Sequence, residues 1–235
     1  VPTMLRDLER YDDEQMRAYI GYLAYLVDHD SVSETMSVFQ GMLESENGES
    51  REEALQYLSS MVERLPEEHL QETVRRCARL VRDREPAVRH AAIEALGCAV
   101  RESEFAVTVL GTVVADEDRG TSERVLACQS LVVLQGRLPA EQRERVAHLL
   151  AYALSEGDVE LAQASAEALT HFSGDLRGSE GLLRRFFEKE PPHIIAAAME
   201  GLSLALLESN LGPSERMELS YVIHHAANRV GDRKS

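Results

Sequence analysis

The chain has 235 residues, of which 44% are hydrophobic, 28% are charged and only 5% are aromatic. This aliphatic content excludes a wholly disordered chain, and the scarcity of prolines and of long alternating runs of β-branched residues favours an all-helical protein. The formal net charge of −16 argues against binding to nucleic acid or to anionic membrane surfaces, because both present negative charge that basic residues must neutralise.

Helical patterns alternate along the chain in two sets, which we call outer and inner. The outer set is expected at 31–45, 66–82, 103–115, 139–155, 179–189 and 213–229. The inner set is expected at 13–28, 50–64, 86–101, 121–137, 158–173 and 191–208. Consecutive members form antiparallel pairs. Because an isolated pair cannot bury its apolar stripe, the pairs must stack on one another.

We therefore predict an all-α, right-handed α-solenoid of about six helix pairs, in a single domain that spans residues 1–235. The repeats are expected at 1–30, 31–65, 66–101, 102–137, 138–174 and 175–208, followed by a capping helix at 213–230. A single domain is expected because no linker rich in Pro, Gly or Ser interrupts the pattern.

A leucine recurs in every inner helix at intervals of 33 to 38 residues. The positions are Leu23, Leu58, Leu96, Leu131, Leu169 and Leu202. Four residues earlier stand Tyr19, Ala54, Ala92, Ala127, Ser165 and Ala198, which are nearly all small. Residues at i and i+4 share a helix face, so the small residue is expected to admit a neighbouring helix and the leucine to fill the groove beside it.

Prolines give an independent measure of the period. Pro66, Pro139 and Pro213 stand where outer helices are expected to begin, and acidic residues follow each of them. Their separations are 73 and 74 residues, twice the leucine interval. Two unrelated signals therefore agree on one repeat length.

The best-defined repeat segment is DREPAVRHAAIEALG, from Asp83 to Gly97. Its turn acid, Pro, Val-Arg, Ala-Ala and Ala-Leu-Gly resemble the HEAT repeat, especially the short form named after phycobilisome lyases. The resemblance is also recognisable at 49–60, 120–136, 157–170 and 190–204. It implies a binding scaffold more strongly than an activity.

The same resemblance implies an arginine that bonds adjacent repeats. Arg51, Arg89 and Arg124 occupy the position of this arginine. Ala162 and Ile195 replace it in two later repeats, where the bond is expected to be missing.

His90 and Glu94 stand at i and i+4 and therefore share a helix face, which raises the question of a metal site. The helix start resembles that of deoxyhypusine hydroxylase, a di-iron HEAT-repeat enzyme, which places Glu directly after His in several repeats. Here Ala91 follows His90, and the chain has no His-Glu dipeptide. We therefore expect a solvated His–Glu pair, no catalytic residue, no metal and no cofactor.

Two other activities occur among HEAT-like proteins. HEAT-like DNA glycosylases need a basic groove and aromatic side chains, whereas this chain is acidic and has no Trp. A bilin lyase is excluded by no motif, and an enzyme or enzyme subunit of that type remains the alternative function. A regulatory segment of a larger protein is a further alternative.

Cysteine usage and hydropathy indicate the compartment. Cys77, Cys98 and Cys128 are widely spaced within helical patterns, which favours buried free thiols in a reducing compartment. The longest nearly apolar run, IIAAAMEGLSLALL, is too short to span a bilayer, and no signal-peptide pattern opens the chain. We expect a cytoplasmic protein.

A second ladder stands two residues before the leucines. Its members are Gln56, Glu94, Gln129, Glu167 and Glu200, and we call them the inner row. One interpretation is a solvated helix position, where Glu and Gln are good helix formers. The functional interpretation is that the inner helices line a concave wall, on which the inner row, together with Glu52 and His90, binds a basic or amide-rich segment of another protein.

Overall fold

The computed structural model describes residues 32–154, 158–172 and 193–200, together with 213, 214, 216, 217, 220, 221 and 224. Every regular element in these residues is helical. The α-helices are α3 (Val32–Leu43), α4 (Gly48–Met61), α5 (Glu67–Leu80), α6 (Pro86–Gly97), α7 (Ser103–Ala115), α8 (Thr121–Leu134), α9 (Ala140–Ala153) and α10 (Val159–His171). Short 3₁₀ turns, Val62–Arg64, Val100–Glu102 and Gln135–Arg137, follow α4, α6 and α8.

These helices fall into four pairs that match the repeats expected between residues 31 and 174. The pairs are α3 with α4, α5 with α6, α7 with α8, and α9 with α10. The first expected repeat and the segment 173–192 lie outside the described residues, whereas residues 193–200 are helical as expected. The all-α solenoid of HEAT-like helix pairs is therefore confirmed as the fold class.

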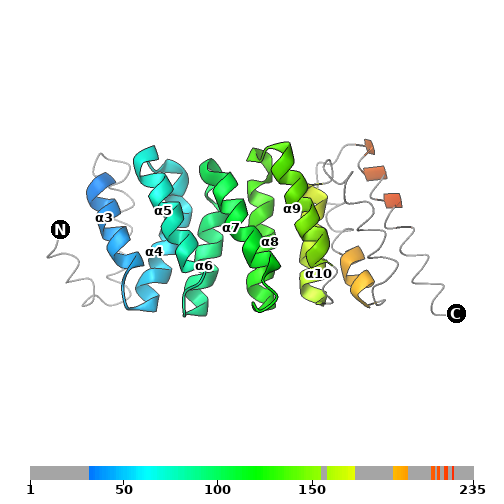
Figure 1. Ribbon diagram of the computed structural model, residues 1–235, viewed down its shortest axis with the longest axis horizontal. Helices are drawn as coiled ribbons and strands as arrows, with labels where there is room; N and C mark the ends of the chain where they lie inside the picture. Colours follow the sequence, from blue (N-terminus) through cyan, green and yellow to red (C-terminus); the bar gives the residue numbers. More distant parts are fainter. Residues whose placement is uncertain are drawn as a thin grey trace. The chain divides into compact units, whose positions relative to one another are not determined.

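The chain divides into two compact units, residues 1–106 and 107–235. In the first unit, α4 packs against both α3 and α6, and α5 packs against α6. In the second unit, α10 packs against both α8 and α9. Inner helices of successive repeats therefore lie side by side within each unit (Figure 1). A single domain over the whole chain remains a prediction.

Prolines begin two of the outer helices as the sequence predicts, and side-chain caps begin two of the inner helices. Pro66 and Pro139 are the N-cap residues of α5 and α9. The Asn47 side chain accepts a hydrogen bond from the Glu49 backbone N–H at 2.9 Å and caps α4. The Asp158 carboxylate does the same for α10, accepting from the Leu161 backbone N–H at 2.9 Å. Such caps satisfy backbone donors that have no partner within the helix.

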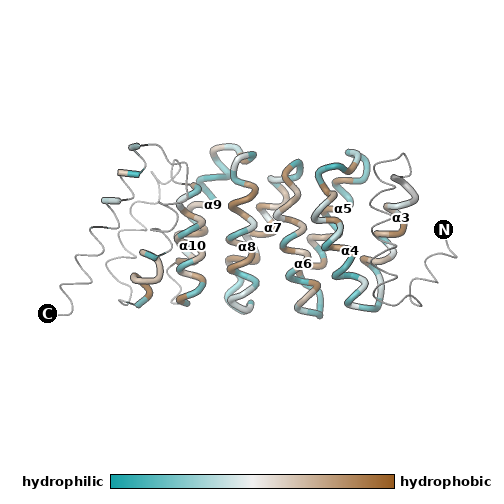
Figure 2. Tube along the Cα trace, turned by 180° about the vertical axis from the view of Figure 1, so that it is seen from behind, coloured by the Kyte–Doolittle hydropathy of each residue, from teal (hydrophilic) through white to brown (hydrophobic). Residues whose placement is uncertain are grey.

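The core includes the leucine ladder and the small residues one turn before it. Leu58, Leu96, Leu131 and Leu169 are completely buried, as are Ala54, Ala92, Ala127, Ser165 and Ala198. Leu23 and Leu202 lie outside the described residues. Each helix carries both hydrophilic and hydrophobic residues along its length (Figure 2). The amphipathic pattern thus places its aliphatic side between the paired helices.

Candidate functional site

The inner row lies on the solvent-facing side of the inner helices. All five of its members, Gln56, Glu94, Gln129, Glu167 and Glu200, are exposed. Two residues along an α-helix correspond to a rotation of about 200°. A side chain two residues before a buried leucine therefore points away from the core, which explains why these residues are exposed.

In the first unit the inner row comprises Gln56 on α4 and Glu94 on α6, the neighbouring inner helix. The Gln56 amide donates a hydrogen bond to a carboxylate oxygen of Glu52 at 3.0 Å, so these two residues support each other. Glu52 and His90 are half-buried at the edge of the same face. The first unit therefore gathers four of the seven predicted binding residues on two adjacent helices.

In the second unit, Gln129 on α8 and Glu167 on α10 stand on adjacent inner helices. Their side chains form no hydrogen bond or ion pair with any other described residue, and neither does that of Glu94 in the first unit. Glu200 is exposed in the helical segment 193–200. Continuity of the inner row from one unit to the other remains a prediction.

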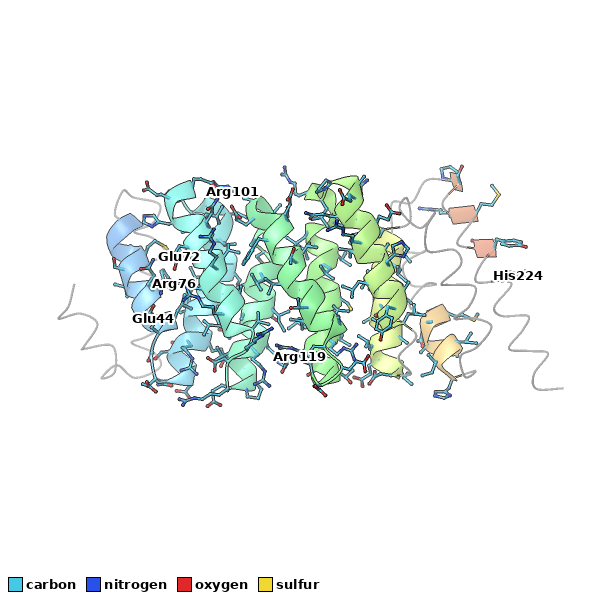
Figure 3. All side chains as sticks on the ribbon, in the orientation of Figure 1. Glu44, Glu72, Arg76, Arg101, Arg119 and His224 are labelled. Atoms are coloured by element: carbon cyan, nitrogen blue, oxygen red, sulfur yellow. The ribbon has the colours of Figure 1, made fainter. Side chains whose placement is uncertain are left out.

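The outer helices and the turns differ from the inner row, because many of their acids are paired with arginines. Arg76 on α5 forms ion pairs with Glu72 of its own helix and with Glu44 at the end of the α3 segment (Figure 3). Arg101 pairs with Glu67 at the start of α5. Exposed pairs of this kind contribute little to stability. They do neutralise acids that otherwise remain available to a partner.

The same contrast holds in the second unit. Arg119, labelled in Figure 3, donates from its two guanidinium edges to Asp116 at 3.1 Å and to Glu123 at 2.8 Å. Arg145 on α9 donates to Glu141 one turn earlier at 2.6 Å. In both units arginines pair many acids of the turns and outer helices, and Arg119 also pairs Glu123 at the start of the inner helix α8. Glu94 and Glu167 are left unpaired, as is Glu144 on the outer helix α9.

A buried arginine connects adjacent repeats in the first unit. The Arg51 guanidinium of α4 donates two parallel hydrogen bonds to the Asp83 carboxylate, at 2.8 and 2.9 Å, and a third to the Ser45 carbonyl at 2.7 Å. The exposed fractions of the two side chains are only 7% and 9%. Arg51 therefore forms the inter-repeat bond that the HEAT resemblance implies.

The arginines that occupy the corresponding position in other repeats have different hydrogen-bond partners. Arg89 donates to the carbonyls of Asp83 and Arg84, both in the turn just before its own helix, at 2.9 and 3.1 Å. Arg124 is buried and donates to the Val114 carbonyl at 2.8 Å. Where Ala162 replaces the arginine, the position is fully buried and apolar. The residue at this position and its hydrogen-bond partners therefore differ from one repeat to the next.

Two turn acids are held in their ionised form. Burial alone raises the pKa of Asp83, but hydrogen bonds from Arg51 and from the Glu85 backbone N–H, with the nearby positive charges, outweigh burial and lower it. For Asp158, burial is outweighed by the backbone N–H of Leu161 and by further donors, among them the Thr121 hydroxyl at 2.7 Å, so its pKa is also lowered. Both acids stabilise turns.

The Thr121–Asp158 bond was not expected from the sequence. It joins the starts of two successive inner helices, 37 residues apart. A hydroxyl at one helix start and an acid at the next are the only sequence signal, and such residues are common at helix starts for capping alone. The sequence alone therefore does not predict this hydrogen bond.

The cysteines bear out the expectation in part. All three are free, and Cys77 and Cys128 are buried, but Cys98 is partly exposed, so the prediction for Cys98 was wrong. Cys98 is the C-cap residue of α6, one turn after Glu94, and hence lies on the same side as Glu94. Burial raises the pKa of Cys77 to about 12. Partial burial and the carboxylates of Glu94 and Glu63 raise the pKa of Cys98, which keeps the thiol protonated at neutral pH.

Neither a metal centre nor a membrane span was found in the part of the chain that the structure describes. Within it, no group of three or more His, Cys, Asp or Glu residues is placed to hold a metal ion. His90 and Glu94 remain a pair without a third ligand there. Among the helices of the same residues, none is long and apolar enough to cross a bilayer.

Comparison with known proteins shows similarity in fold. No protein-family model matches the chain, and no curated protein matches its sequence. The karyopherin Kap121p bound to the extreme C-terminus of the protein phosphatase Cdc14p is similar with a TM-score of 0.61 and 16% identity, over 92% of this chain and 24% of the karyopherin. This chain therefore spans about a quarter of the karyopherin's length.

Two proteins of similar size give the same result. A designed armadillo repeat protein is similar with a TM-score of 0.53 and 15% identity, over 96% of this chain and 98% of the other. The crescerin structure described as a TOG domain array is similar with a TM-score of 0.54 and 16% identity, over 87% and 90%. At these identities the likeness shows the fold, which is a HEAT- or armadillo-like α-solenoid.

Proposed function

We propose that the protein is a non-catalytic scaffold or adaptor that binds a segment of another protein along the inner row. The observation that carries this proposal is the contrast between paired and unpaired acids. Arginines neutralise many, though not all, of the acids on the outer helices and in the turns, whereas Glu94 and Glu167 are exposed and unpaired on the inner helices. An exposed, unpaired carboxylate attracts a cationic group of a partner.

The spacing of the inner helices favours a chain segment as the ligand. Packed helices lie about 8–10 Å apart, so a similar spacing is expected from one member of the inner row to the next within a unit. An extended segment advances about 3.3 Å per residue and meets a new member about every three residues. Small molecules need an enclosed pocket with several convergent groups, whereas the inner row is an open line of exposed side chains.

The chemistry of the inner row favours a segment rich in Lys, Arg, Asn or Gln. Carboxylates accept hydrogen bonds from cations, and the two glutamines both donate to and accept from a peptide backbone. The solved karyopherin complex gives a precedent for the fold, since that protein is bound to the C-terminus of a phosphatase. The net charge of −16 supports a protein partner over nucleic acid or an anionic membrane.

A photo-crosslinking experiment tests which face binds and identifies the partner in one step. A benzoylphenylalanine residue replaces Gln129 on the inner helix α8 in one variant and Glu144 on the outer helix α9 in a matched variant; both positions are exposed. After irradiation in cell extract, adducts identified by mass spectrometry are expected from the Gln129 position and not from the Glu144 position. Adducts from the Glu144 position alone contradict the proposal.

The phycobilisome-lyase subtype is a separate hypothesis that rests on the motif at 83–97. It predicts that the protein takes up a linear tetrapyrrole. Visible absorption of the protein mixed with phycocyanobilin tests it, because a bound bilin shifts and sharpens the spectrum. The scaffold proposal predicts an unchanged spectrum.

A further inference from the structure

The surroundings of the inner row differ from helix to helix. On a helix surface, the neighbours of residue i are the residues at i±3 and i±4. For Gln129 on α8, all four neighbours are aliphatic: Val125, Leu126, Val132 and Val133. For Gln56 on α4, the four matching residues are polar: Glu52, Glu53, Ser59 and Ser60. Around the same repeat position, α8 thus carries aliphatic side chains and α4 carries polar ones.

The aliphatic neighbours of Gln129 are accessible to solvent. Val133 is 61% exposed, and Val125, Leu126 and Val132 are each partly exposed. Gln129 itself has no hydrogen-bond partner among the described residues, whereas Gln56 is engaged by Glu52. We call Val125, Leu126, Gln129, Val132 and Val133 the α8 patch. Exposing these apolar side chains to water costs free energy that would not be lost if they were buried.

The corresponding neighbours on α6 and α10 show that the α8 patch is not a general feature of the repeat. The residues at i±4 are His90 and Cys98 around Glu94, and Gln163 and His171 around Glu167. None of these is aliphatic. On α6 and α10 the residues at i±3, which are Ala91, Gly97, Ala164 and Thr170, are buried. Exposed aliphatic side chains therefore flank the inner row on α8 alone among these four helices.

The neighbouring inner helix supplies negative charge. Helix α10 packs against α8, and both Glu160 and Glu167 on α10 are exposed. The side chains of these two glutamates form no ion pair or hydrogen bond with other described residues. An aliphatic surface on one helix thus lies beside a carboxylate surface on the next, about 8–10 Å away.

We infer that the inner face of the second unit binds a protein segment in which an aliphatic side chain is followed, two or three residues away, by Lys or Arg. The aliphatic side chain packs on the α8 patch, and the cation pairs with Glu160 or Glu167. In an extended segment, two or three residues span about 7–10 Å, which matches the distance between packed helices. The inference rests on the proposed function and names the chemistry of its partner.

A random twelve-residue peptide library displayed on phage and selected against the full chain tests the inference. The expected consensus contains Leu, Ile or Val with Lys or Arg two or three positions away. A synthetic peptide with that consensus is then titrated by fluorescence polarisation. Val133→Ser, which gives α8 the residue that α4 has at this position, is expected to weaken binding about five- to tenfold, because apolar contact area is lost.

Two further variants separate the components of the interaction. Glu160→Gln combined with Glu167→Gln is expected to weaken binding of the same peptide and to remove most of its salt dependence. Ser60→Ala on α4, at the position that matches Val133, is the control and is expected to leave the affinity unchanged. Because Val133 and Ser60 are both exposed, thermal unfolding should show that all variants remain folded.

The outcomes distinguish this inference from the function on which it rests. If the selected peptides bind Val133→Ser as tightly as the original chain, yet lose affinity for Glu94→Arg combined with Glu167→Arg, the α8 inference is wrong and the scaffold proposal stands. If selection enriches no peptide above background, both are wrong. A consensus without an aliphatic residue overturns the inference alone.

Discussion

The Arg51–Asp83 pair and the inner-row residue Glu94 are charged residues of the same two repeats, yet their environments are opposite. Arg51 and Asp83 are almost completely buried and bonded to each other, so their charges hold one repeat against the next. Glu94, on α6 of the same unit, is exposed and without an ion pair. The comparison teaches that charge in this fold occurs in two settings: it is buried and paired where it holds repeats together, and it is exposed and unpaired where we propose that it binds a partner.

The largest expected effect is the removal of one partner of the buried pair. Asp83→Ala leaves the Arg51 guanidinium buried without its counter-charge, which is expected to cost about 3–5 kcal/mol of stability. Chemical denaturation monitored by circular dichroism measures the change. The same truncation at Glu94, an exposed residue, is the control and should change the free energy of unfolding by less than about 0.5 kcal/mol. Equal losses at the two sites contradict the comparison.

A second prediction concerns two residues that stand two positions apart in the sequence and face opposite ways. Leu131 is fully buried and Gln129 is exposed on the same helix. Leu131→Ala is expected to cost about 2–5 kcal/mol, because it removes core contacts and leaves a cavity. Gln129→Ala should be close to neutral. Thermal unfolding of both variants measures the two stability changes. If Leu131→Ala leaves stability unchanged and Gln129→Ala lowers it, the assignment of the two helix faces is reversed.

The pH dependence of stability provides the third prediction. The pKa of Asp83 is lower in the folded protein than its ordinary value of 3.8. Its stabilising contribution is therefore fully present above that value and is lost as the pH falls through the lower pKa of the folded state. The stability difference between the original chain and Asp83→Asn is expected to be largest near neutral pH and to shrink as the pH falls from about 5 to 3. A difference that grows on acidification contradicts this account.

The period of the fold was predictable because it depends on spacing. Leucines at 33- to 38-residue intervals and prolines at twice that interval identified the helix pairs, and the structure places Leu58, Leu96, Leu131 and Leu169 in the core. The exposure of the inner row follows from the same periodicity, because a residue two positions away from a buried leucine lies on the opposite side of the helix. Whether the inner row binds a partner is a question that periodicity does not address.

The specific polar contacts were less predictable, because they depend on turn geometry. The HEAT resemblance indicated which arginine bonds the next repeat, and Arg51 does so, but Arg89 occupies the same position and bonds its own turn. Cys98 was expected to be buried because cysteine residues are usually buried. Its place one turn after Glu94 was the better signal, since residues at i and i+4 share a face.

A small expected effect on stability accompanies the largest expected effect on binding. Glu94→Arg combined with Glu167→Arg changes only exposed residues, so the fold is expected to lose less than about 1 kcal/mol. Glu68→Arg combined with Glu144→Arg makes the same change in net charge at exposed positions on the outer helices α5 and α9. Because the two double variants differ only in the face that they alter, any difference between them reports the binding surface.

The most direct test of the central claim is the affinity of these two double variants for the crosslinked partner, measured by isothermal titration calorimetry at two salt concentrations. The inner-face variant is expected to bind at least about tenfold more weakly than the original chain, with a reduced salt dependence, because two attractive carboxylates become repulsive cations. The outer-face variant is expected to keep nearly the original affinity. Loss of binding in the outer-face variant, with full affinity in the inner-face variant, would contradict the account.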